Sequence, residues 1–467
     1  MGSLFSSLQT ASTALDVFSR ALGTDQTNVA NASTPGYAAQ QSTILPIDLS
    51  GDGGSVSDFI SLSSNANSFA DATVQAASSQ SSASQTSAQQ LTSVNQLFDI
   101  TGTTGILAAL QQFSSAFSSL SVTPGDSTLQ ANALTAAGNV ASAFQSVTAS
   151  LDTQQNQIDS NIQSTTAQIN NLAANIQQLN VQTEAGGSNP SNDANLRNDL
   201  DQLSSLVDIT VTKSSDGSVS VLAGGQLPLV DGNQLYTITA NPGASPGSQI
   251  SSSAGGNSPV AFSGQLGALL ETRNTVIGGL LGANGEPGTL NTLASGFASR
   301  VNSLLTSGVT ASGAAGVPIF SFDTSDPTNA ARSLTLNSSV TPGQLALAST
   351  GTSAQSNGIA KALAALPSST AAADEIGGLS PEGLFGSLAS SVGQQLSDAQ
   401  TASTSDQTTL TNAQTNRQQQ IGVSLNQEAA NITTYQRAYG ANAQIVSVLS
   451  QLTSDALNMI SGSSGTL

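Results

Sequence analysis

Apolar residues near the N-terminus recur in steps of three and four, so they fall on one side of a helix. They are Leu4, Leu8, Ala11, Leu15, Phe18, Leu22 and Val29, with Asp25 at the one polar position of the stripe. The spacing predicts a helix over about residues 3–31. Pro35 and Gly36 then end it, because proline has no backbone donor and disfavours helical geometry in the preceding residue.

The end of this helix reads NVANASTPGY over residues 28–37. Asn28 and Asn31 lie one turn apart and can hydrogen-bond main-chain groups near the helix end. Tyr37 adds a rigid apolar ring with a polar tip. Taken alone, this stretch favours an ordinary helix end followed by a turn.

The C-terminal segment carries a second apolar stripe with the same spacing. Its members are Ile421, Leu425, Ile432, Tyr435, Tyr439, Val446 and Leu449, and a parallel stripe holds Ile445, Val448, Leu452 and Met459. The pattern predicts one helix over about residues 415–461, with Glu428 and Asn442 at seam positions. Two such terminal helices can pair as a coiled coil, and their remaining apolar surface then requires a further partner.

The middle of the chain begins with the longest regular stripe. Its apolar members run from Val140 through Phe144 and Leu151 to Leu179, and Asp126 is a candidate N-cap after Pro124. This predicts a helix over about residues 128–182, roughly 80 Å long. Its flanking residues are polar but uncharged, so packing must choose its partners, and Leu110, Phe113, Phe117 and Leu120 supply apolar candidates.

Residues 207–240 change to alternating β-branched positions broken by Asp-Gly and Gly-Gly, which predicts short strands joined by tight turns. Helical spacing returns in GQLGALLETRNTVIGGL and LNTLASGFASRVNSLL. A turn-rich stretch with short apolar runs follows, and NGIAKALAAL resumes the helical pattern. The expected fold is therefore mainly α with a minor β component: paired terminal helices, a long-helix bundle and a small β-containing insertion.

Composition excludes several function classes. Only 8% of residues are charged and the net charge is −19, so nucleic acid and anionic membranes are poor partners. Without His or Cys there is no imidazole base, disulfide or thiolate metal site. No run of about 18 apolar residues exists, and the N-terminus lacks the basic and apolar regions of a cleaved signal peptide. We expect no catalytic residue, cofactor or metal, and interpret the acidic stretch 323–329 as a solvated turn rather than a calcium loop.

Motifs at both ends carry a family resemblance. NVANASTPGYAAQ resembles the N-terminal motif of flagellar axial proteins, the rod, hook and hook-associated family, and LNQEAANITTYQRAYGANAQIVSVLSQL is similar to that family's C-terminal helix. The middle elements INNLAANIQQLN, AGGQLPLVDG, GQLGALLETRN and LASGFASRVN resemble the hook-associated branch. Two features depart from the family: Ala38, Ala39 and Gln40 stand where it usually has an Arg after Gly-Tyr, and the chain is short.

The resemblance implies which residues serve assembly. On the N-terminal side these are Leu15, Phe18, Leu22, Asn28, Asn31, Thr34, Pro35, Gly36 and Tyr37. On the C-terminal helix they are Glu428, Asn431, Tyr435, Gln436, Tyr439 and Asn442. Within the first group, the residues from Asn28 to Tyr37 would form an elbow where the chain leaves an inner-tube helix. For the tyrosines, packing within the helix pair is as good an interpretation as contact between subunits.

The resemblance also implies a segment order. The expected segments are an inner-tube helix and elbow at 1–58, a helical middle domain with a β-hairpin segment at 59–307, a β-rich outer insertion at 308–356, return helices at 357–417, and a C-terminal inner-tube helix at 418–467. It implies a non-enzymatic junction protein between flagellar hook and filament, assembled as a ring of identical subunits. The implied partners are the hook protein, a second junction protein, flagellin, the flagellar export apparatus and an export chaperone, and the implied location is extracellular.

Two other functions stay open from the sequence. One is a hook or distal-rod subunit that polymerises, which requires a β-rich middle. The other is a secreted enzyme such as a peptidoglycan hydrolase, which requires a cleft with paired carboxylates.

Overall fold

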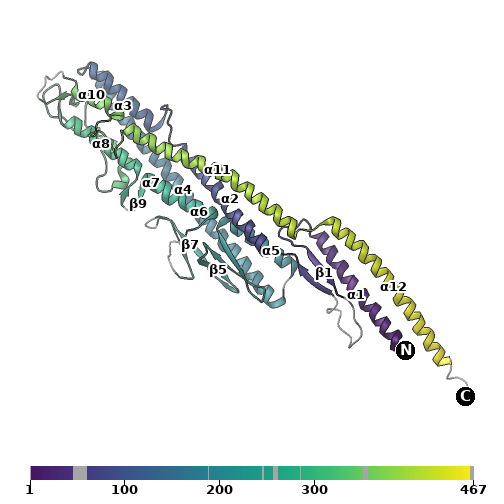
Figure 1. The fold of residues 1–467 in the computed structure, drawn as a ribbon. Helices are drawn as coiled ribbons and strands as arrows, with labels where there is room; N and C mark the ends of the chain where they lie inside the picture. Colours follow the sequence, from purple (N-terminus) through teal and green to yellow (C-terminus); the bar gives the residue numbers. More distant parts are fainter. Residues whose placement is uncertain are drawn as a thin grey trace.

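The protein is a long rod, with its terminal helices at one end and a bundle of helices with small sheets along the rest (Figure 1). The computed structural model describes residues 2–45, 60–187, 189–243, 247–255, 261–283, 285–350 and 356–462. Parts of four expected segments, among them residues 46–59, 351–355 and 463–467, lie outside the described residues, so the expected boundaries stay predictions. No helix in the described ranges has the length and apolarity needed to cross a membrane.

The two ends of the chain form one antiparallel helix pair. Helix α1 (Gly2–Ala30) runs beside α12 (Leu425–Gly462), and the start of α1 and the end of α12 lie at the same tip of the rod (Figure 1). The prediction of an N-terminal helix is thereby confirmed. Strands β1 (Gln40–Ile44) and β2 (Ile60–Ser64) form an antiparallel hairpin, and β1 contacts α1.

The prediction of a single helix over residues 415–461 is wrong. Helix α11 (Pro381–Ile421) ends first, Gly422 takes an extended conformation, and α12 starts afresh at Leu425. The Ser424 hydroxyl accepts a hydrogen bond from the backbone N–H of Gln427, as an N-cap does. The apolar spacing continues across the break, and this is why periodicity did not reveal it.

The body of the rod is organised around α4 (Ser127–Gly186), which confirms the predicted long helix. Asp126 caps it by accepting hydrogen bonds from the backbone of Thr128 and Leu129 at 2.8 and 3.1 Å. Nearly all of its predicted stripe is buried. It packs on α3 (Gly105–Val122), whose Phe113 lies against Phe297 of α8 (Thr289–Thr306) with ring centroids 5.2 Å apart.

The remaining helices surround this core. They are α2 (Ser68–Asn95), α5 (Pro190–Leu206), α6 (Gly264–Glu271), the π-helix η2 (Thr272–Ile277), α7 (Gly278–Leu281), α9 (Ala330–Ser333) and α10 (Gly358–Ala365). Three short 3-10 turns are η3 (Pro327–Asn329), η4 (Pro342–Gln344) and η5 (Leu366–Ser368). Helix α2 runs along α11 through a largely polar seam, in which Ser81 donates to Gln407.

The predicted strands lie on α4. Four of them, β3 (Ile209–Lys213), β4 (Val219–Ala223), β5 (Leu227–Asp231) and β6 (Gln234–Leu235), form an antiparallel sheet in chain order. A hairpin of β7 (Ile238–Asn241) and β8 (Gln249–Ser252) follows. The buried amide of Asn180 holds β4 to the helix, because it donates to the Val219 carbonyl at 2.8 Å and accepts from the Val219 N–H at 2.9 Å.

The later strands are each two residues long. They are β9 (Gly282–Ala283), β10 (Glu286–Pro287), β11 (Gly308–Val309), β12 (Phe320–Ser321), β13 (Thr335–Leu336) and β14 (Ala348–Ser349), and each pairs with only one other strand. The expected fold class, mainly α with a minor β component, is confirmed.

Candidate assembly site

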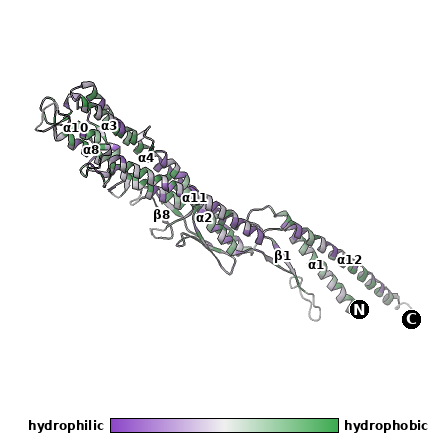
Figure 2. Ribbon diagram, turned by 45° about the horizontal axis from the view of Figure 1, so that its top comes forward, coloured by the Kyte–Doolittle hydropathy of each residue, from purple (hydrophilic) through white to green (hydrophobic). Residues whose placement is uncertain are grey.

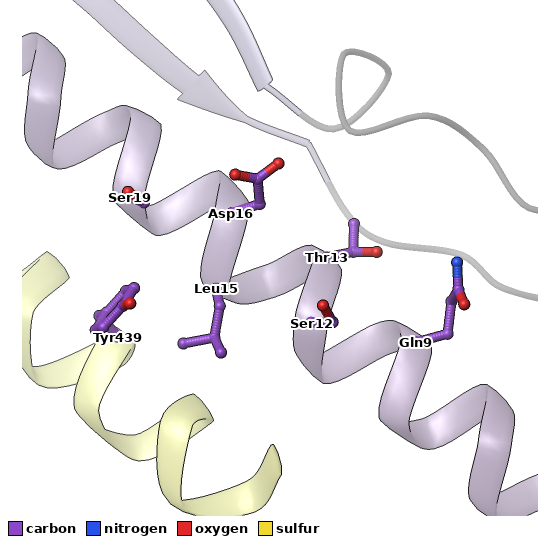
Figure 3. Close-up of a pocket in the computed structure, with 7 residues that line it drawn as sticks. All are labelled: Gln9, Ser12, Thr13, Leu15, Asp16, Ser19 and Tyr439. Carbon is purple, nitrogen blue, oxygen red and sulfur yellow. The ribbon is translucent and has the colours of Figure 1, made fainter.

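The seam between α1 and α12 brings several of the candidate residues together. The rings of Phe18 and Tyr435 face each other with centroids 6.2 Å apart. One turn of α1 closer to the N-terminus, Leu15 lies opposite Tyr439 (Figure 3). Leu22 is half-buried in the same seam. The apolar stripes of both helices therefore face one another, as the spacing predicts.

Asn28 is the centre of the elbow that follows α1. Its side chain is fully buried and makes four hydrogen bonds. Its Nδ2 donates to the Gln40 carbonyl at 2.8 Å and to Glu428 Oε1 at 3.2 Å. Its Oδ1 accepts from the Tyr37 hydroxyl and from the Gln40 N–H, both at 2.9 Å. One asparagine thus joins α1, the elbow, β1 and α12.

The buried groups around Asn28 shift each other's protonation. Burial, with a smaller contribution from the nearby Glu428, raises the pKa of the Tyr37 phenol. Burial and the Asp25 and Glu428 carboxyls likewise raise the pKa of Tyr435. Both phenols therefore stay neutral, and the Tyr37 hydroxyl keeps the proton that it donates to Asn28.

In the turn after α1, one residue caps the helix end and two others are exposed on the surface. Asn31 donates to the Thr27 carbonyl at 2.9 Å and accepts from the Thr34 hydroxyl at 3.2 Å, so it closes the helix end. Thr34 and Pro35 are exposed. In the described part of the chain none of these three residues hydrogen-bonds to α12. The sequence pattern alone did not separate them from Asn28.

Gly36 connects the elbow to the body of the rod. It has φ +75°, and a Cβ on it would run into the carbonyl oxygen of Ala194 on α5. Arg197 of α5 donates from Nη1 to the Gly36 carbonyl at 2.7 Å. Only glycine combines this backbone conformation with such a close approach. The elbow therefore rests on a helix of its own chain.

Arg197 belongs to a half-buried ionic network at this joint. It lies 3.5 Å from Asp71 of α2, and Arg417 of α11 lies 3.5 Å from Asp71 and 2.7 Å from Asp201 of α5. Burial raises the pKa of Asp71, although Arg197 and Arg417 act in the opposite direction. The network ties three body helices together where the elbow docks. Sequence reasoning did not find it, because its members come from three distant segments of the chain. Asp71 lies 126 residues before Arg197, and Arg417 lies 216 residues after Asp201.

The hairpin after the elbow packs on a second face of α1. Val17, Ala21 and Ile60 form a small buried cluster that the predicted stripe does not include. Ala38 and Ala39 are buried, and the Ala39 N–H donates to the Ile421 carbonyl at 2.8 Å. The departure from the family's Arg therefore places small residues where the chain packs against the end of α11.

The other C-terminal candidates differ from Glu428 and Tyr435 in their surroundings. Asn442 donates to the Ala438 carbonyl of its own helix at 2.9 Å, and Asn431 accepts from Gln427 at 3.0 Å. Gln436 and Tyr439 are exposed. These side chains leave hydrogen-bonding groups and ring surface at the outside of the pair.

A shallow groove of about 450 Å³ lies along α1 (Figure 3). Its lining consists of Gln9, Ser12, Thr13, Leu15, Asp16, Ser19 and Tyr439. Asp16 is the single carboxylate in this lining, so the groove holds no carboxylate pair. The buried pair Asp25 and Glu428 has no access to a substrate, because both residues lie inside the helix contact.

Acidic residues elsewhere in the body have structural partners. Asp152 pairs with Arg332, and Asp159 pairs with Arg273 of the π-helix at 3.1 Å. Asp323 accepts hydrogen bonds from Ser325, which lower the pKa of its carboxyl. In the described part of the chain no group of three or more Asp and Glu side chains is placed to hold a metal ion.

Comparison with known proteins agrees with the fold. Residues 91–320 match the family model of the flagellar hook-associated protein FlgK helical domain. Flagellar hook-associated protein 1 of Bacillus subtilis is 26% identical over 506 residues, covering 98% of this chain and 99% of the relative. The resemblance to FlgK-type hook-associated proteins is confirmed. The flagellar hook-associated proteins 1 of Escherichia coli and Salmonella typhimurium are 23% and 24% identical to this chain. The matches cover 59% and 62% of those two proteins.

A solved structure shows the same fold. The flagellar hook junction protein FlgK from Burkholderia pseudomallei matches with a TM-score of 0.61 at 15% identity, covering 74% of this chain and 99% of that one. The names of all these relatives describe a hook-associated or hook junction protein, and none describes an enzyme.

Proposed function

We propose that this FlgK-like chain is a structural junction protein that connects the flagellar hook to the filament. It assembles as a ring of identical subunits through its terminal helices and catalyses no reaction. The names of its relatives and the mainly helical body support this role over a polymerising hook subunit, which would need a β-rich middle.

The observation that carries the proposal is the apolar surface that α1 leaves uncovered on α12. Ile445, Val448 and Leu452 are 49%, 59% and 48% exposed, and Met459 is 75% exposed. Figure 2 shows apolar positions recurring along both terminal helices. A stripe of this length on one helix requires cover in the working state, and neighbouring copies in a ring supply the same surface repeatedly.

The register of the helix pair adds a second argument. Helix α12 has 38 residues and α1 has 29, and Phe18 stands opposite Tyr435. The last turns of α12 therefore extend beyond the start of α1, as Figure 1 shows. Leu457, 58% exposed, lies in this overhang together with Met459. The overhang is a natural contact for the next subunit of an inner tube.

The candidate residues then divide into two roles. Asn28, Gly36, Tyr37 and Glu428 are enclosed by their own chain and hold the angle between the helix pair and the body. Leu15, Phe18, Leu22 and Tyr435 form the seam. The outward residues Thr34, Pro35, Gln436, Asn431 and Asn442 face neighbouring subunits, as does the exposed part of Tyr439, whose ring otherwise lies against Leu15.

The proposed role implies partners outside the ring. The hook protein lies below, and a second junction protein and flagellin lie above. The flagellar export apparatus, with a dedicated chaperone, delivers the chain to an extracellular position on the flagellum.

A strain that lacks this chain tests the role. We expect electron microscopy to show hooks without filaments, and flagellin released into the medium. Loss of the hooks themselves would instead place the chain in the rod or hook, and intact filaments would contradict the proposal.

Complementation with point variants tests the mechanism. Val448→Asp puts a charge on the uncovered stripe of α12, so we expect a folded monomer that restores no filaments. Ile100→Asp is the matched control, since Ile100 is also well exposed, at 62%, but lies in the body. Filament growth with Val448→Asp equal to that with Ile100→Asp would contradict assembly through α12.

A further inference from the structure

Two acidic side chains meet inside the contact between the terminal helices. Asp25 of α1 is 3% exposed and Glu428 of α12 is 7% exposed. They lie within hydrogen-bonding reach of each other. No donor among the described residues reaches Asp25 Oδ2 or Glu428 Oε2. Two buried carboxyl groups in contact, each with an oxygen that no donor reaches, require a positive group or a proton at the contact.

The described residues around this pair provide no positive charge. The neighbouring polar groups are Asn28 on α1, Tyr37 in the elbow, Gln40 on β1 and Tyr435 on α12. The described hairpin strands β1 and β2 contain no charged residue. The nearest Arg along α1 is Arg20, which is exposed and paired with Asp16 at 3.9 Å. Asn28 satisfies only Glu428 Oε1, through the hydrogen bond at 3.2 Å.

A single proton between the two carboxyl groups is enough to remove their repulsion. Two carboxyl groups in contact cannot both ionise without strong repulsion, so one stays protonated and donates to the other. Burial, and then the charge and hydrogen bond of Glu428, raise the pKa of Asp25 to about 7. The apparent value belongs to the pair as a whole.

We propose that Asp25 and Glu428 share one proton and thereby form a pH-dependent clasp that closes α1 onto α12. When the helices separate, water solvates both carboxyls and the proton leaves. The paired state therefore binds one more proton than the separated state. The clasp is a property of the chain itself and does not depend on what the chain assembles with.

The sign of the effect follows from this proton. Asp25 has its ordinary pKa of 3.8 in the separated state and a raised one in the pair. The shared proton therefore favours pairing fully at a pH below the ordinary pKa of Asp25. This contribution weakens as the pH rises towards the raised pKa. Each pH unit within this window costs up to about tenfold in the ratio of paired to separated helices. Above the raised value, near pH 7, the ratio becomes constant.

The full-length chain offers a clean test because it contains no Cys. Ser12→Cys and Ser447→Cys place spin labels on exposed positions of α1 and α12, and electron spin resonance then measures the distance between the helices. We expect the short-distance population to decline between about pH 5 and pH 7 and to stay constant up to about pH 9. Dilution at each pH keeps self-association out of the measurement.

Matched variants identify the groups responsible. Asp25→Asn keeps a hydrogen-bond donor beside Glu428 without a titrating proton, so the helices should stay paired throughout the same pH range. Glu428→Gln should behave alike. Asp16→Asn removes an exposed carboxylate from the same helix and should keep the pH dependence of the original chain.

Several outcomes would overturn the proposal. These are pairing that does not vary with pH in the original chain, helices that stay separated at every pH, and an Asp25→Asn variant with unchanged pH dependence. Recovery of pairing at about pH 9 on addition of calcium chloride, but not of sodium chloride at the same ionic strength, would show that a metal cation, and not a proton, bridges the pair.

Discussion

Asn28 and Glu428 lie 400 residues apart in the sequence and meet in a hydrogen bond of 3.2 Å. The same asparagine holds the Tyr37 hydroxyl and both backbone groups of Gln40. The N-terminal helix, the elbow and the C-terminal helix therefore share one buried polar centre. A change at this centre affects the whole joint between the helix pair and the body.

Asn28→Ala should loosen this joint strongly. The substitution leaves the Tyr37 hydroxyl, the Gln40 backbone and Glu428 without partners, and we expect a loss of about 2–4 kcal/mol in the local free energy of unfolding. Hydrogen exchange of α1 and the first turns of α12 measures it. Asn31→Ala is the control, because its hydrogen bonds are local and half-exposed, and it should cost below about 1 kcal/mol. Equal effects would contradict the central role of Asn28.

Gly36→Ala should detach the elbow from α5. An Ala side chain would meet the Ala194 carbonyl and would also have to adopt a positive φ, so we expect a cost of more than about 1 kcal/mol. Protease cleavage within the elbow should become faster. Gly23→Ala has open space around its Cβ within α1 and should stabilise that helix by about 0.5–1 kcal/mol. A Gly36→Ala chain as resistant to protease as the original would refute the close contact.

Asn180→Ala should weaken the attachment of the four-stranded sheet to α4. The buried amide binds Val219 in both directions and also donates to the Gly232 carbonyl at 2.7 Å. Its removal leaves three backbone groups unsatisfied, so we expect a loss of about 2–4 kcal/mol in urea unfolding. Gln177→Ala, one turn away with a single exposed hydrogen bond to Asn233, should change stability by less than about 1 kcal/mol.

Phe113→Ala should destabilise the body more than any surface change. Phe113 is fully buried between Phe117 and Phe297, with ring centroids at 4.5 and 5.2 Å. We expect a loss of about 3–5 kcal/mol in urea unfolding, from lost burial and the cavity left behind. Phe69→Ala removes a ring that is 80% exposed, and it should change the free energy of unfolding by less than about 0.5 kcal/mol. If the two variants unfold at the same urea concentration, the packing described for Phe113 is wrong.

The sequence predicted those elements that depend on local signals. The long helix α4 follows from a regular apolar stripe and from the Asp126 cap, and both act within a few residues of the chain. The strands β3 to β6 follow from alternation and from glycine turns. The break at Gly422 was missed because Ile421 and Leu425 keep helical spacing, although Ser424 and Gln427 carry the residue types of a capping box.

The site depended on contacts that no local pattern contains. Asp25 and Glu428 were each visible as a polar residue at an apolar seam position, but only the register of the helix pair brings them together. The contact of Gly36 with Arg197 spans two segments of unrelated pattern. The π-helix over Thr272–Ile277 was also not predictable, since its apolar residues fit an α-helix equally well.

The break between α11 and α12 gives the rod a point of mechanical compliance. The chain crosses from the body to the helix pair only twice, between β2 and α2 and between Ile421 and Leu425. Besides these crossings, the hydrogen bonds from Arg197 to Gly36 and from Ala39 to Ile421 span the joint. Bending there strains a few polar contacts, whereas bending α4 or α11 would disturb continuous helical hydrogen bonding. A bending force on the rod would therefore be expected to deflect this joint first, while the helices on either side keep their shape.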